Sequence, residues 1–193
     1  MKSICVYCGS SDKIQPEYYE VARQMGSTIA NRGIQLWYGA GSTGLMGALA
    51  EAVLAAGGEV IGVIPAMFNN PTLAHYGLTR LEVVEGMHER KQRLAENADA
   101  FVALPGGYGT FEELFEILTW AQIGLHCKPI GVLNAFGYYD RLLNMLEYAL
   151  EQGFIYNEHR LLLHTAHEPE VLLDAMQAYR APEGLERWLT RMD

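Results

Sequence analysis

Short apolar runs alternate with longer amphipathic segments along most of the chain. Uninterrupted runs of Val, Ile and Leu are typical of strands that are buried on both faces, and apolar residues three or four positions apart are typical of helices. The expected strands span residues 4–7, 34–38, 60–64, 80–84, 100–104, 129–133 and 161–165. The expected helices span residues 16–31, 45–56, 138–151 and 169–179, and two others carry Arg90 and Glu112.

This alternation predicts a Rossmann-like α/β fold, a doubly wound parallel sheet with helices on both faces. A chain of 193 residues fits one domain, which we expect over residues 1–180. In the tail, residues 181–193, the apolar side chains of Leu185, Trp188 and Leu189 are spaced to dock as one more amphipathic turn. Asn, Pro and Gly interrupt residues 66–79, which predicts a loop with short helical pieces.

Composition and charge exclude several classes of function. Half of the residues are hydrophobic and 19% are charged, as in an ordinary globular protein. A net charge of −9 argues against a nucleic-acid partner. No apolar run approaches the roughly 20 residues that a membrane helix needs, and the start of the chain shows no signal-peptide pattern. We therefore expect a cytoplasmic protein without a membrane partner.

The cysteines and histidines do not predict a metal site. Cys5 and Cys8 have the spacing of a redox or zinc half-site, but the three cysteines include no second pair. Both fall in or at the end of the first strand, so we expect small buried hydrophobic residues. The six histidines show no pair at metal-ligand spacing.

A glycine-rich turn separates the fifth expected strand from the next helix. Pro105, Gly106 and Gly107 stop the strand, and Thr110 stands where a helix N-cap is expected. Glu112 and its neighbour then fall in the first turn, where the helix dipole favours ionised carboxylates. A helix N-terminus suits a phosphate, and a carboxylate beside it suggests chemistry next to the anion. The alternative is a tight turn whose acids only complement the dipole.

Residues 39–44 match the dinucleotide fingerprint G-x-G-x-x-G, after a strand and before a helix. The fingerprint also requires an acid at the end of the following strand, which here ends in Ile64 and Pro65. This disfavours a nicotinamide cofactor but leaves a phosphate-binding loop. Glycine-bearing loops follow the first, second and fifth strands, so we expect them to converge at the carboxyl edge of the sheet.

Residues 105–113, PGGYGTFEE, resemble the Pro-Gly-Gly-x-Gly-Thr-x-x-Glu signature of the Lonely Guy family of cytokinin riboside 5'-monophosphate phosphoribohydrolases, long mislabelled as lysine decarboxylases. Residues 39–47 and 87–91 resemble the family's first glycine loop and its Arg-Lys segment. The likeness extends from about residue 3 to about residue 179.

The resemblance assigns roles that the residues alone leave open. On spacing alone, Arg90 and Lys91 fit a solvated helix face, whereas the matching family residues contact substrate and the arginine is regarded as catalytic. Neighbouring helical glutamates point about 100° apart, so Glu112 and Glu113 cannot both face the same atom. The signature's final glutamate corresponds to Glu113, so the resemblance implies that Glu113 is catalytic and leaves Glu112 to hold ribose hydroxyls. Thr119 matches a substrate-contacting position. The other substrate-binding candidates are Gly9, Ser10, Gly41, Ser42, Gly44, Gly106, Gly107, Tyr108, Gly109 and Thr110.

One departure concerns the loop before the fourth strand, where some relatives carry a glutamate and this chain has His75, Tyr76 and Gly77. A substrate contact is therefore not carried over to this loop. His75 could substitute for the glutamate, and an ordinary loop histidine is the simpler interpretation.

The expected reaction is the release of a free purine base and ribose 5-phosphate from a nucleoside 5'-monophosphate, without a cofactor or metal. The base is adenine or an N6-modified adenine. A homodimer is expected from the family and from the apolar side chains of Trp120, Phe136, Tyr138 and Tyr139. The alternatives are a non-catalytic nucleotide sensor and a pyridoxal phosphate-dependent lysine decarboxylase, for which Lys91 is the one lysine in a suspected site.

Overall fold

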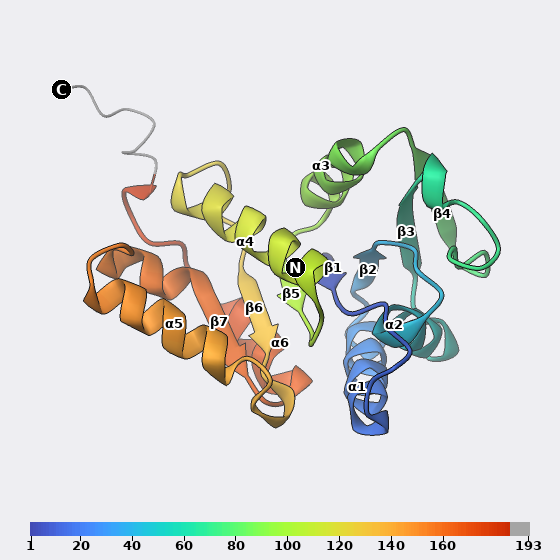
Figure 1. Cartoon of the computed structure of the whole chain (residues 1–193), viewed down its shortest axis with the longest axis horizontal. Coiled ribbons are helices and arrows are strands. Elements are labelled where there is room, and N and C mark those ends of the chain that lie inside the picture. Colours follow the sequence, from blue (N-terminus) through green and yellow to red (C-terminus); the bar gives the residue numbers. More distant parts are fainter. Residues whose placement is uncertain (186–193) are drawn as a thin grey trace.

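One parallel sheet forms the centre of the computed structural model, which describes residues 1–185 (Figure 1). Within these residues the sheet has seven strands in the order β4-β3-β2-β1-β5-β6-β7. The chain therefore moves outward from β1 to β4 and then returns past β1 to β5. The strands are β1 (Ser3–Tyr7), β2 (Gln35–Tyr38), β3 (Val60–Pro65), β4 (Arg80–Val84), β5 (Phe101–Ala103), β6 (Ile130–Leu133) and β7 (Leu163–Ala166).

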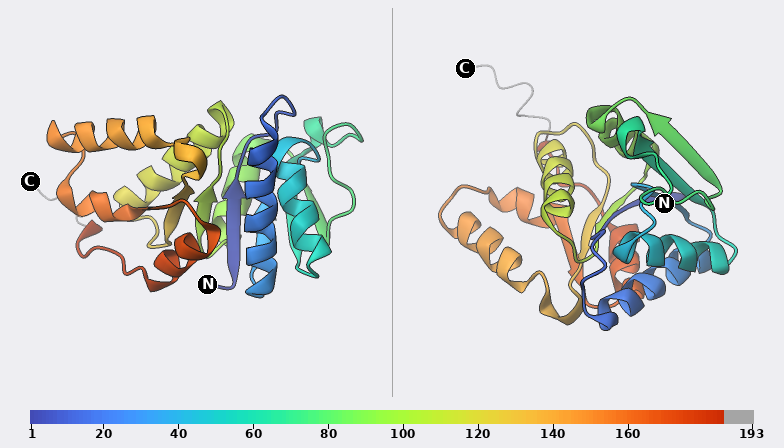
Figure 2. Two further views of the ribbon diagram at one scale, coloured as in Figure 1. Left: turned by 90° about the horizontal axis from the view of Figure 1, so that it is seen from below. Right: turned by 45° about the vertical axis from the view of Figure 1, so that its right-hand side comes forward.

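Helices follow most of the strands and cover both faces of the sheet (Figure 2). They are α1 (Pro16–Asn31), α2 (Gly44–Ala55), α3 (Met87–Asn97), α4 (Tyr108–Gln122), α5 (Asp140–Glu151) and α6 (Pro169–Ala178), and the short 3-10 helices are η1 (Ala66–Phe68), η2 (Ala135–Gly137) and η3 (Asn157–Leu162).

Two cores lie on opposite faces because successive side chains of a strand point to opposite sides. Ile4 and Val6 of β1 pack with α1, α2 and α6, whereas Cys5 and Tyr7 pack with α3 and α4. The burial of all five β1 residues explains the apolar runs in the sequence. The predicted doubly wound α/β fold is confirmed.

Most predicted elements agree with the structure to within one or two residues. Among the strands, the largest shift concerns the one predicted over residues 161–165. There η3 occupies the start of the predicted strand, and β7 begins at Leu163. In the tail, Leu185 is buried in the α3–α4 core, while Trp188 and Leu189 lie outside the described residues. The domain boundary at residue 180 stays a prediction. None of the helices within residues 1–185 is long and apolar enough to cross a membrane.

Candidate active site

Three glycine-bearing loops follow β1, β2 and β5, and we call residues 9–10, 39–44 and 105–110 the glycine-loop site. The winding of the sheet reverses between the neighbouring strands β1 and β5. In open parallel sheets, ligands bind beyond the carboxyl ends of the strands at such a reversal. The topology therefore places these loops where a ligand is expected.

The loop after β1 is hydrogen-bonded to both other loops. The amide of Gly9 donates to the carbonyl of Pro105 at 3.0 Å, and the carbonyl of Gly9 accepts from the amide of Leu45 at 2.9 Å. The hydroxyl of Thr43 donates to the carbonyl of Ser10 at 2.9 Å. These bonds bring the three loops together, as the sequence predicts.

The loop after β2 contacts two neighbours. Gly44 has a φ of +60°, and a Cβ at this position would lie 2.5 Å from the carbonyl carbon of Ser10, so glycine is required. Ser42 is engaged elsewhere, because its amide and hydroxyl donate to the carbonyl of Leu73 at 2.9 and 3.1 Å. Gly41 forms an isolated antiparallel bridge with Ala74. Gly41 and Ser42 therefore contact the loop after β3, and Gly44 contacts the loop after β1.

The structure corrects the predicted start of α4. The helix begins at Tyr108 with Gly107 at its N-cap, so Thr110 is not the N-cap. Thr110 is buried in the first turn, and a Cβ on Gly106 would lie 2.1 Å from its hydroxyl oxygen. Glycine at position 106 leaves room for this side chain. Glu112 lies beyond the first turn, which holds no acidic residue, so it does not complement the helix dipole at the position that the sequence predicted.

The N-terminus of α4 offers unpaired backbone amides. A helix leaves its first N–H groups without intrahelical acceptors. Within the described chain, the amides of Gly107, Tyr108 and Gly109 have no protein acceptor. Tyr108 is 94% exposed, and the two glycines have no side chain to cover the amides. Such a helix end, with its partial positive charge, suits a phosphate.

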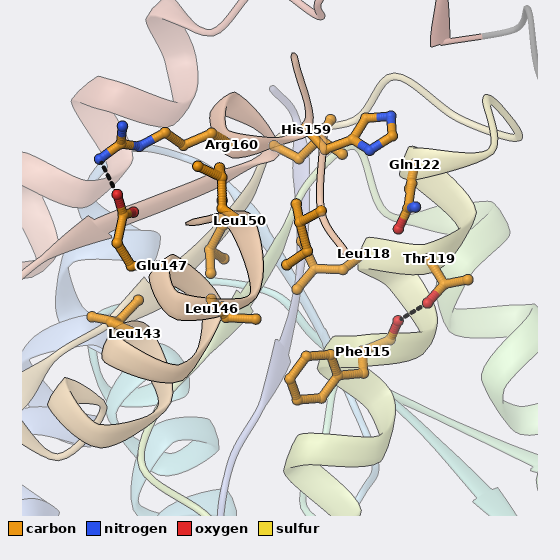
Figure 3. A pocket seen from close by; sticks show the side chains of 13 residues that line it. Phe115, Leu118, Thr119, Gln122, Leu143, Leu146, Glu147, Leu150, His159 and Arg160 are labelled. Carbon is orange, nitrogen blue, oxygen red and sulfur yellow. Dashed lines mark hydrogen bonds and ion pairs between the residues drawn. The ribbon is translucent and has the colours of Figure 1, made fainter. Parts of the chain in front are cut away.

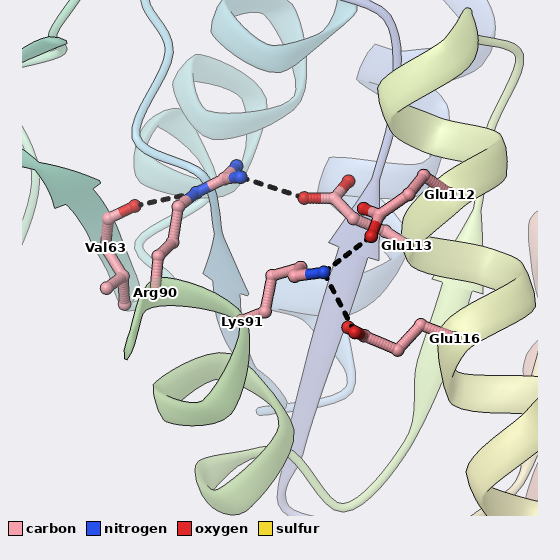
Figure 4. A network of polar contacts seen from close by, with 6 residues as sticks. All are labelled: Val63, Arg90, Lys91, Glu112, Glu113 and Glu116. Carbon is pink, nitrogen blue, oxygen red and sulfur yellow. Dashed lines mark hydrogen bonds and ion pairs between the residues drawn. The ribbon is translucent and has the colours of Figure 1, made fainter. Parts of the chain in front are cut away.

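Arg90 and Glu113 form a buried ion pair between α3 and α4 (Figure 4). Nη1 of Arg90 lies 2.9 Å from Oε1 of Glu113, and the two side chains are only 12% and 11% exposed. Nε of Arg90 donates to the carbonyl of Val63 at 3.3 Å. A Cβ on Gly39 would lie 1.8 Å from the other terminal nitrogen of Arg90. Gly39, at the end of β2, therefore makes the space for the guanidinium, a role that the sequence analysis did not assign.

Burial raises the pKa of Glu113 above its ordinary value. The neighbouring charge of Arg90 opposes this rise, and the charge of Glu112 adds to it. The sequence predicted a carboxylate that the helix dipole keeps ionised, but desolvation, the largest influence on the pKa of Glu113, acts in the opposite direction. A buried carboxyl with a raised pKa and a specific charged partner is typical of active sites.

Lys91 forms a second set of ion pairs (Figure 4). Its Nζ atom lies 2.5 Å from Oε1 of Glu112 and 2.8 Å from Oε1 of Glu116. Glu112 and Glu113 thus point to different cations, as their adjacency on a helix predicts. The sequence analysis missed Glu116, although its spacing of four residues from Glu112 places both carboxylates on one face of α4.

Thr119 lies in the groove between α4 and α5 (Figure 3). Its hydroxyl donates to the carbonyl of Phe115 at 2.7 Å, the preceding turn of the same helix. Seven residues separate it from Glu112, or about 10 Å along the helix axis. The structure therefore does not bring Thr119 together with the glycine-loop site.

His75 takes part in the local structure of its own loop. Its Nδ1 atom accepts a hydrogen bond from the amide of Gly77 at 3.2 Å, and its amide donates to the carbonyl of Ala40 at 2.9 Å. These bonds give His75 a structural role in its loop and favour the interpretation as an ordinary loop histidine.

Cys5 and Cys8 are buried, as predicted, and burial raises the pKa of both thiols. Such thiols are protonated and inert rather than nucleophilic. Cys127 is exposed. In the part of the chain that the structure describes, no group of three His, Cys, Asp or Glu residues is arranged to hold a metal ion.

Comparisons with known proteins identify the family of the chain. The family model described as "Possible lysine decarboxylase" matches residues 46–176. The chain is 44% identical over 178 residues to the cytokinin riboside 5'-monophosphate phosphoribohydrolase LOG7 of Arabidopsis thaliana, and the matched region covers 92% of this chain and 82% of the relative. It is also 44% identical over 178 residues to the enzyme of that name, LOG, of Oryza sativa subsp. japonica, with coverage of 92% and 74%.

Solved structures with lower identity share the fold. The molybdenum cofactor binding protein of Rippkaea orientalis superposes with a TM-score of 0.70 at 22% identity, over 92% of this chain and 97% of that one. The molybdenum cofactor carrier protein of Chlamydomonas reinhardtii gives a TM-score of 0.68 at 21% identity, over 98% of both chains. These two likenesses show the fold alone. The sequence matches are stronger, and by them the chain belongs to the Lonely Guy family of cytokinin riboside 5'-monophosphate phosphoribohydrolases.

Proposed function

We propose that this protein hydrolyses the N-glycosidic bond of a purine nucleoside 5'-monophosphate and releases the free base and ribose 5-phosphate. The observation that carries the proposal is the buried pair of Arg90 on α3 and Glu113 on α4, the helix whose N-terminus offers unpaired amides to a phosphate. The names of the relatives from A. thaliana and O. sativa support this reaction and a cytokinin riboside 5'-monophosphate, an N6-modified adenine nucleotide, as the substrate.

The phosphate binds at the glycine-loop site, where the amides of Gly107, Tyr108 and Gly109 are unpaired. Its binding energy orients the ribose so that C1' lies near the Glu113 carboxylate. The bond between C1' and the base nitrogen breaks with its electron pair on the base, and positive charge develops at C1'. Glu113 in its ionised form stabilises that charge and helps to activate a water molecule. The water supplies the hydroxyl group that joins C1' and the proton that the base takes up.

The two cations and their partners have separate roles in this reaction. Arg90 keeps Glu113 in place and favours its ionised form, and its planar guanidinium can donate two parallel hydrogen bonds to phosphate or base. The pair of Lys91 and Glu112 lies on the outer side of the network, where Glu112 is more than half exposed and free to accept bonds from ribose hydroxyls.

The state of Lys91 argues against a lysine decarboxylase with a Schiff base. A Schiff-base lysine must lose its proton easily, which requires a depressed pKa. Burial disfavours the charge of Lys91, but the hydrogen bonds and charges of Glu112 and Glu116 outweigh it, so the pKa of Lys91 is raised. The lysine is held as a cation.

A panel of purine nucleosides and their 5'-monophosphates tests the proposal. We expect release of free base from adenosine 5'-monophosphate or its N6-modified analogue, and kcat/KM at least about 10²-fold lower for the matching nucleosides, which lack the phosphate. Chromatography of the free base gives the measurement. Equal cleavage of a nucleoside and its monophosphate would show that the phosphate site is misassigned, and no base from any compound would contradict the reaction.

We further propose that the protein is a homodimer that uses the outer face of α4 and α5. The residues of α5 include none that is buried, and the exposed apolar side chains of the two helices include Phe115, Met145 and Tyr148, with Leu161 exposed in η3. The groove between the two helices encloses about 280 Å³ (Figure 3). An apolar face of this kind is typical of a permanent interface, which buries on the order of 2,000 Å² or more.

Light scattering at micromolar concentration is expected to give twice the 21.5 kDa mass of one chain. Met145→Asp places a charge on the proposed interface and should shift the mass towards the monomer. Val171→Asp, at an equally exposed apolar residue on α6, is the matched control and should leave the dimer intact. A wild-type protein with the mass of one chain would refute the dimer.

A further inference from the structure

In the loop of residues 104–107, which precedes α4, every backbone carbonyl accepts a hydrogen bond from within the protein. The carbonyls of Pro105 and Gly107 accept from the amides of Gly9 and Phe111, both at 3.0 Å. The two other carbonyls, those of Leu104 and Gly106, accept from side chains of the connection between β6 and α5. By contrast, within residues 1–185 the amides from Gly106 to Gly109 have no protein acceptor.

Two consecutive tyrosines supply these side-chain donors. The hydroxyl of Tyr139 donates to the carbonyl of Leu104 at 2.6 Å, and the hydroxyl of Tyr138 donates to the carbonyl of Gly106 at 2.5 Å. Both bonds cross between connections more than 30 residues apart in the chain. A carbonyl that is held by a donor cannot rotate towards a bound anion. The carbonyl of Gly106 shares its peptide plane with the N–H group of Gly107, so the bond from Tyr138 also directs that N–H group away from the donor. The carbonyl of Leu104 shares its plane with Pro105, which has no N–H group, so the bond from Tyr139 fixes only the start of the loop.

The tyrosines are themselves held in place. The amide of Tyr139 donates to Oδ1 of Asn134 at 2.7 Å, and Nδ2 of Asn134 donates to Oδ1 of Asp140 at 2.7 Å. The ring of Tyr138 packs edge-to-face on Tyr139 and on Tyr18 of α1, with centroids 5.1 and 6.0 Å apart. Bonds that fix the turn and rings that fix the side chains give the two hydroxyl groups defined positions.

The turn also contains strained backbone. Phe136 has a φ of +53°, a conformation that is uncommon for a residue with a side chain, and Gly137 follows with a φ of +72°. A Cβ on Gly137 would lie 2.6 Å from Oδ2 of Asp140. Residues in sparsely populated conformations persist only where the surroundings over-determine them, and they concentrate near functional sites.

We propose that Tyr138 is a positioning residue that holds the carbonyl of Gly106 so that the amide of Gly107, beside those of residues 108 and 109, stays available to the substrate phosphate, and that Tyr139 supports this arrangement by fixing the carbonyl of Leu104 at the start of the loop. This role rests on the proposed phosphoribohydrolase function, because it names what organises the phosphate site of that reaction. The tyrosines act through the glycine loop and do not themselves touch the reacting atoms.

Tyr138→Phe tests the proposal because it removes only the hydroxyl group of a side chain that is 38% exposed. The freed carbonyl of Gly106 can then turn towards the phosphate. We expect the Kd for ribose 5-phosphate, measured by calorimetry, and the KM for the monophosphate to rise about fivefold to tenfold. The melting temperature should change little, and kcat should fall by less than KM rises, since the loop binds the phosphate in the ground state too.

Two variants separate positioning from packing. Tyr18 belongs to the same aromatic cluster, but its hydroxyl group is not bonded to the loop. Tyr18→Phe should therefore bind ribose 5-phosphate like the wild type. Tyr139→Phe leaves the buried carbonyl of Leu104 without a donor. It should therefore lower the melting temperature as well as weaken the binding of ribose 5-phosphate.

The outcomes distinguish this proposal from the proposed function. Unchanged binding of ribose 5-phosphate in a folded Tyr138→Phe protein would overturn the positioning role, and so would a wild-type protein that does not bind ribose 5-phosphate. A wild-type protein that binds ribose 5-phosphate but releases no base, combined with weaker binding in Tyr138→Phe, would contradict the reaction and support the positioning role.

Discussion

Glu113→Gln is expected to lower kcat by about 10²-fold or more and to leave KM close to the wild-type value. The positive charge at C1' develops in the transition state, so a carboxylate that stabilises it contributes little to the binding of the ground state. Glutamine has the same shape and its amide oxygen can still accept from Nη1 of Arg90. Initial rates of base release over a range of monophosphate concentrations give both constants.

Glu112→Gln is the matched control for this variant. Glu112 is the neighbouring carboxylate, but it is more exposed and pairs with Lys91 rather than Arg90. Its loss should change KM more than kcat if it holds ribose hydroxyls. Near-wild-type base release in Glu113→Gln, together with a large loss in Glu112→Gln, would reverse the two assignments.

Loss of the Glu113 charge has two opposed effects on stability at neutral pH, because it leaves the buried Arg90 without its counter-charge and also removes the cost of ionising a buried carboxyl group. The pKa of this carboxyl is raised in the folded protein, so between its ordinary and its raised pKa the folded state binds more protons than the unfolded state. The free energy of unfolding then decreases as pH rises through this range. An uncharged glutamine avoids that decrease, so the melting temperature of Glu113→Gln near pH 7 serves as a check on folding.

The fold was predictable because strands buried on both faces leave a clear mark in the sequence. All of β1 is buried, and its run of apolar residues between loop signals predicts a parallel strand. The start of α4 was misplaced because threonine and glycine are about equally frequent N-caps, so the sequence does not distinguish Thr110 from Gly107 at this position. The consequence is chemical, since it moves both glutamates out of the first turn and away from the dipole.

The glycine loops were predictable in sequence, but the pairing of charges was not. Arg90 and Glu113 are 23 residues apart on different helices, and their contact depends on how α3 and α4 pack over the sheet. Gly39 belonged to a recognised motif, yet its contact with the guanidinium follows only from three-dimensional packing. Local sequence patterns predict which backbone can bind an anion, and tertiary packing decides which side chains share the site.

Tyr139 shows how composition can mislead about surfaces. The sequence counts it among apolar side chains in excess of one domain's needs, as support for a dimer. In the structure it is fully buried, and its hydroxyl is bonded to the carbonyl of Leu104. Phe136 is exposed, as a residue available to a partner would be. The support for a dimer therefore comes from α4 and α5 rather than from this tyrosine.

Arg90→Ala is expected to lower kcat/KM by roughly 10²-fold or more, through both constants. The variant removes a donor to the substrate and also the cation beside Glu113. The buried pair predicts an effect on folding, because removal of one partner leaves the other charge buried and unpaired. We therefore expect a lower melting temperature, and rates should be measured well below it.

The pH dependence of Arg90→Ala separates its two effects. Activity requires ionised Glu113, so the activity of the wild type should be lost as pH falls through the pKa of this carboxyl. Arg90 opposes the rise of that pKa, so its removal raises the pKa further and the loss should occur at higher pH than in the wild type. The profile of kcat/KM against pH gives the measurement.

Arg90→Lys is the matched control, since it restores the positive charge without the planar pair of donors. Its acidic limb should lie closer to that of the wild type, while its KM stays raised. The double variant Arg90→Ala/Glu113→Gln should lose the acidic limb and be little less active than the slower single variant, because residues that act as a unit are not additive. An acidic limb at the same pH in the wild type and Arg90→Ala would show that the ion pair does not control the ionisation of Glu113 during the reaction.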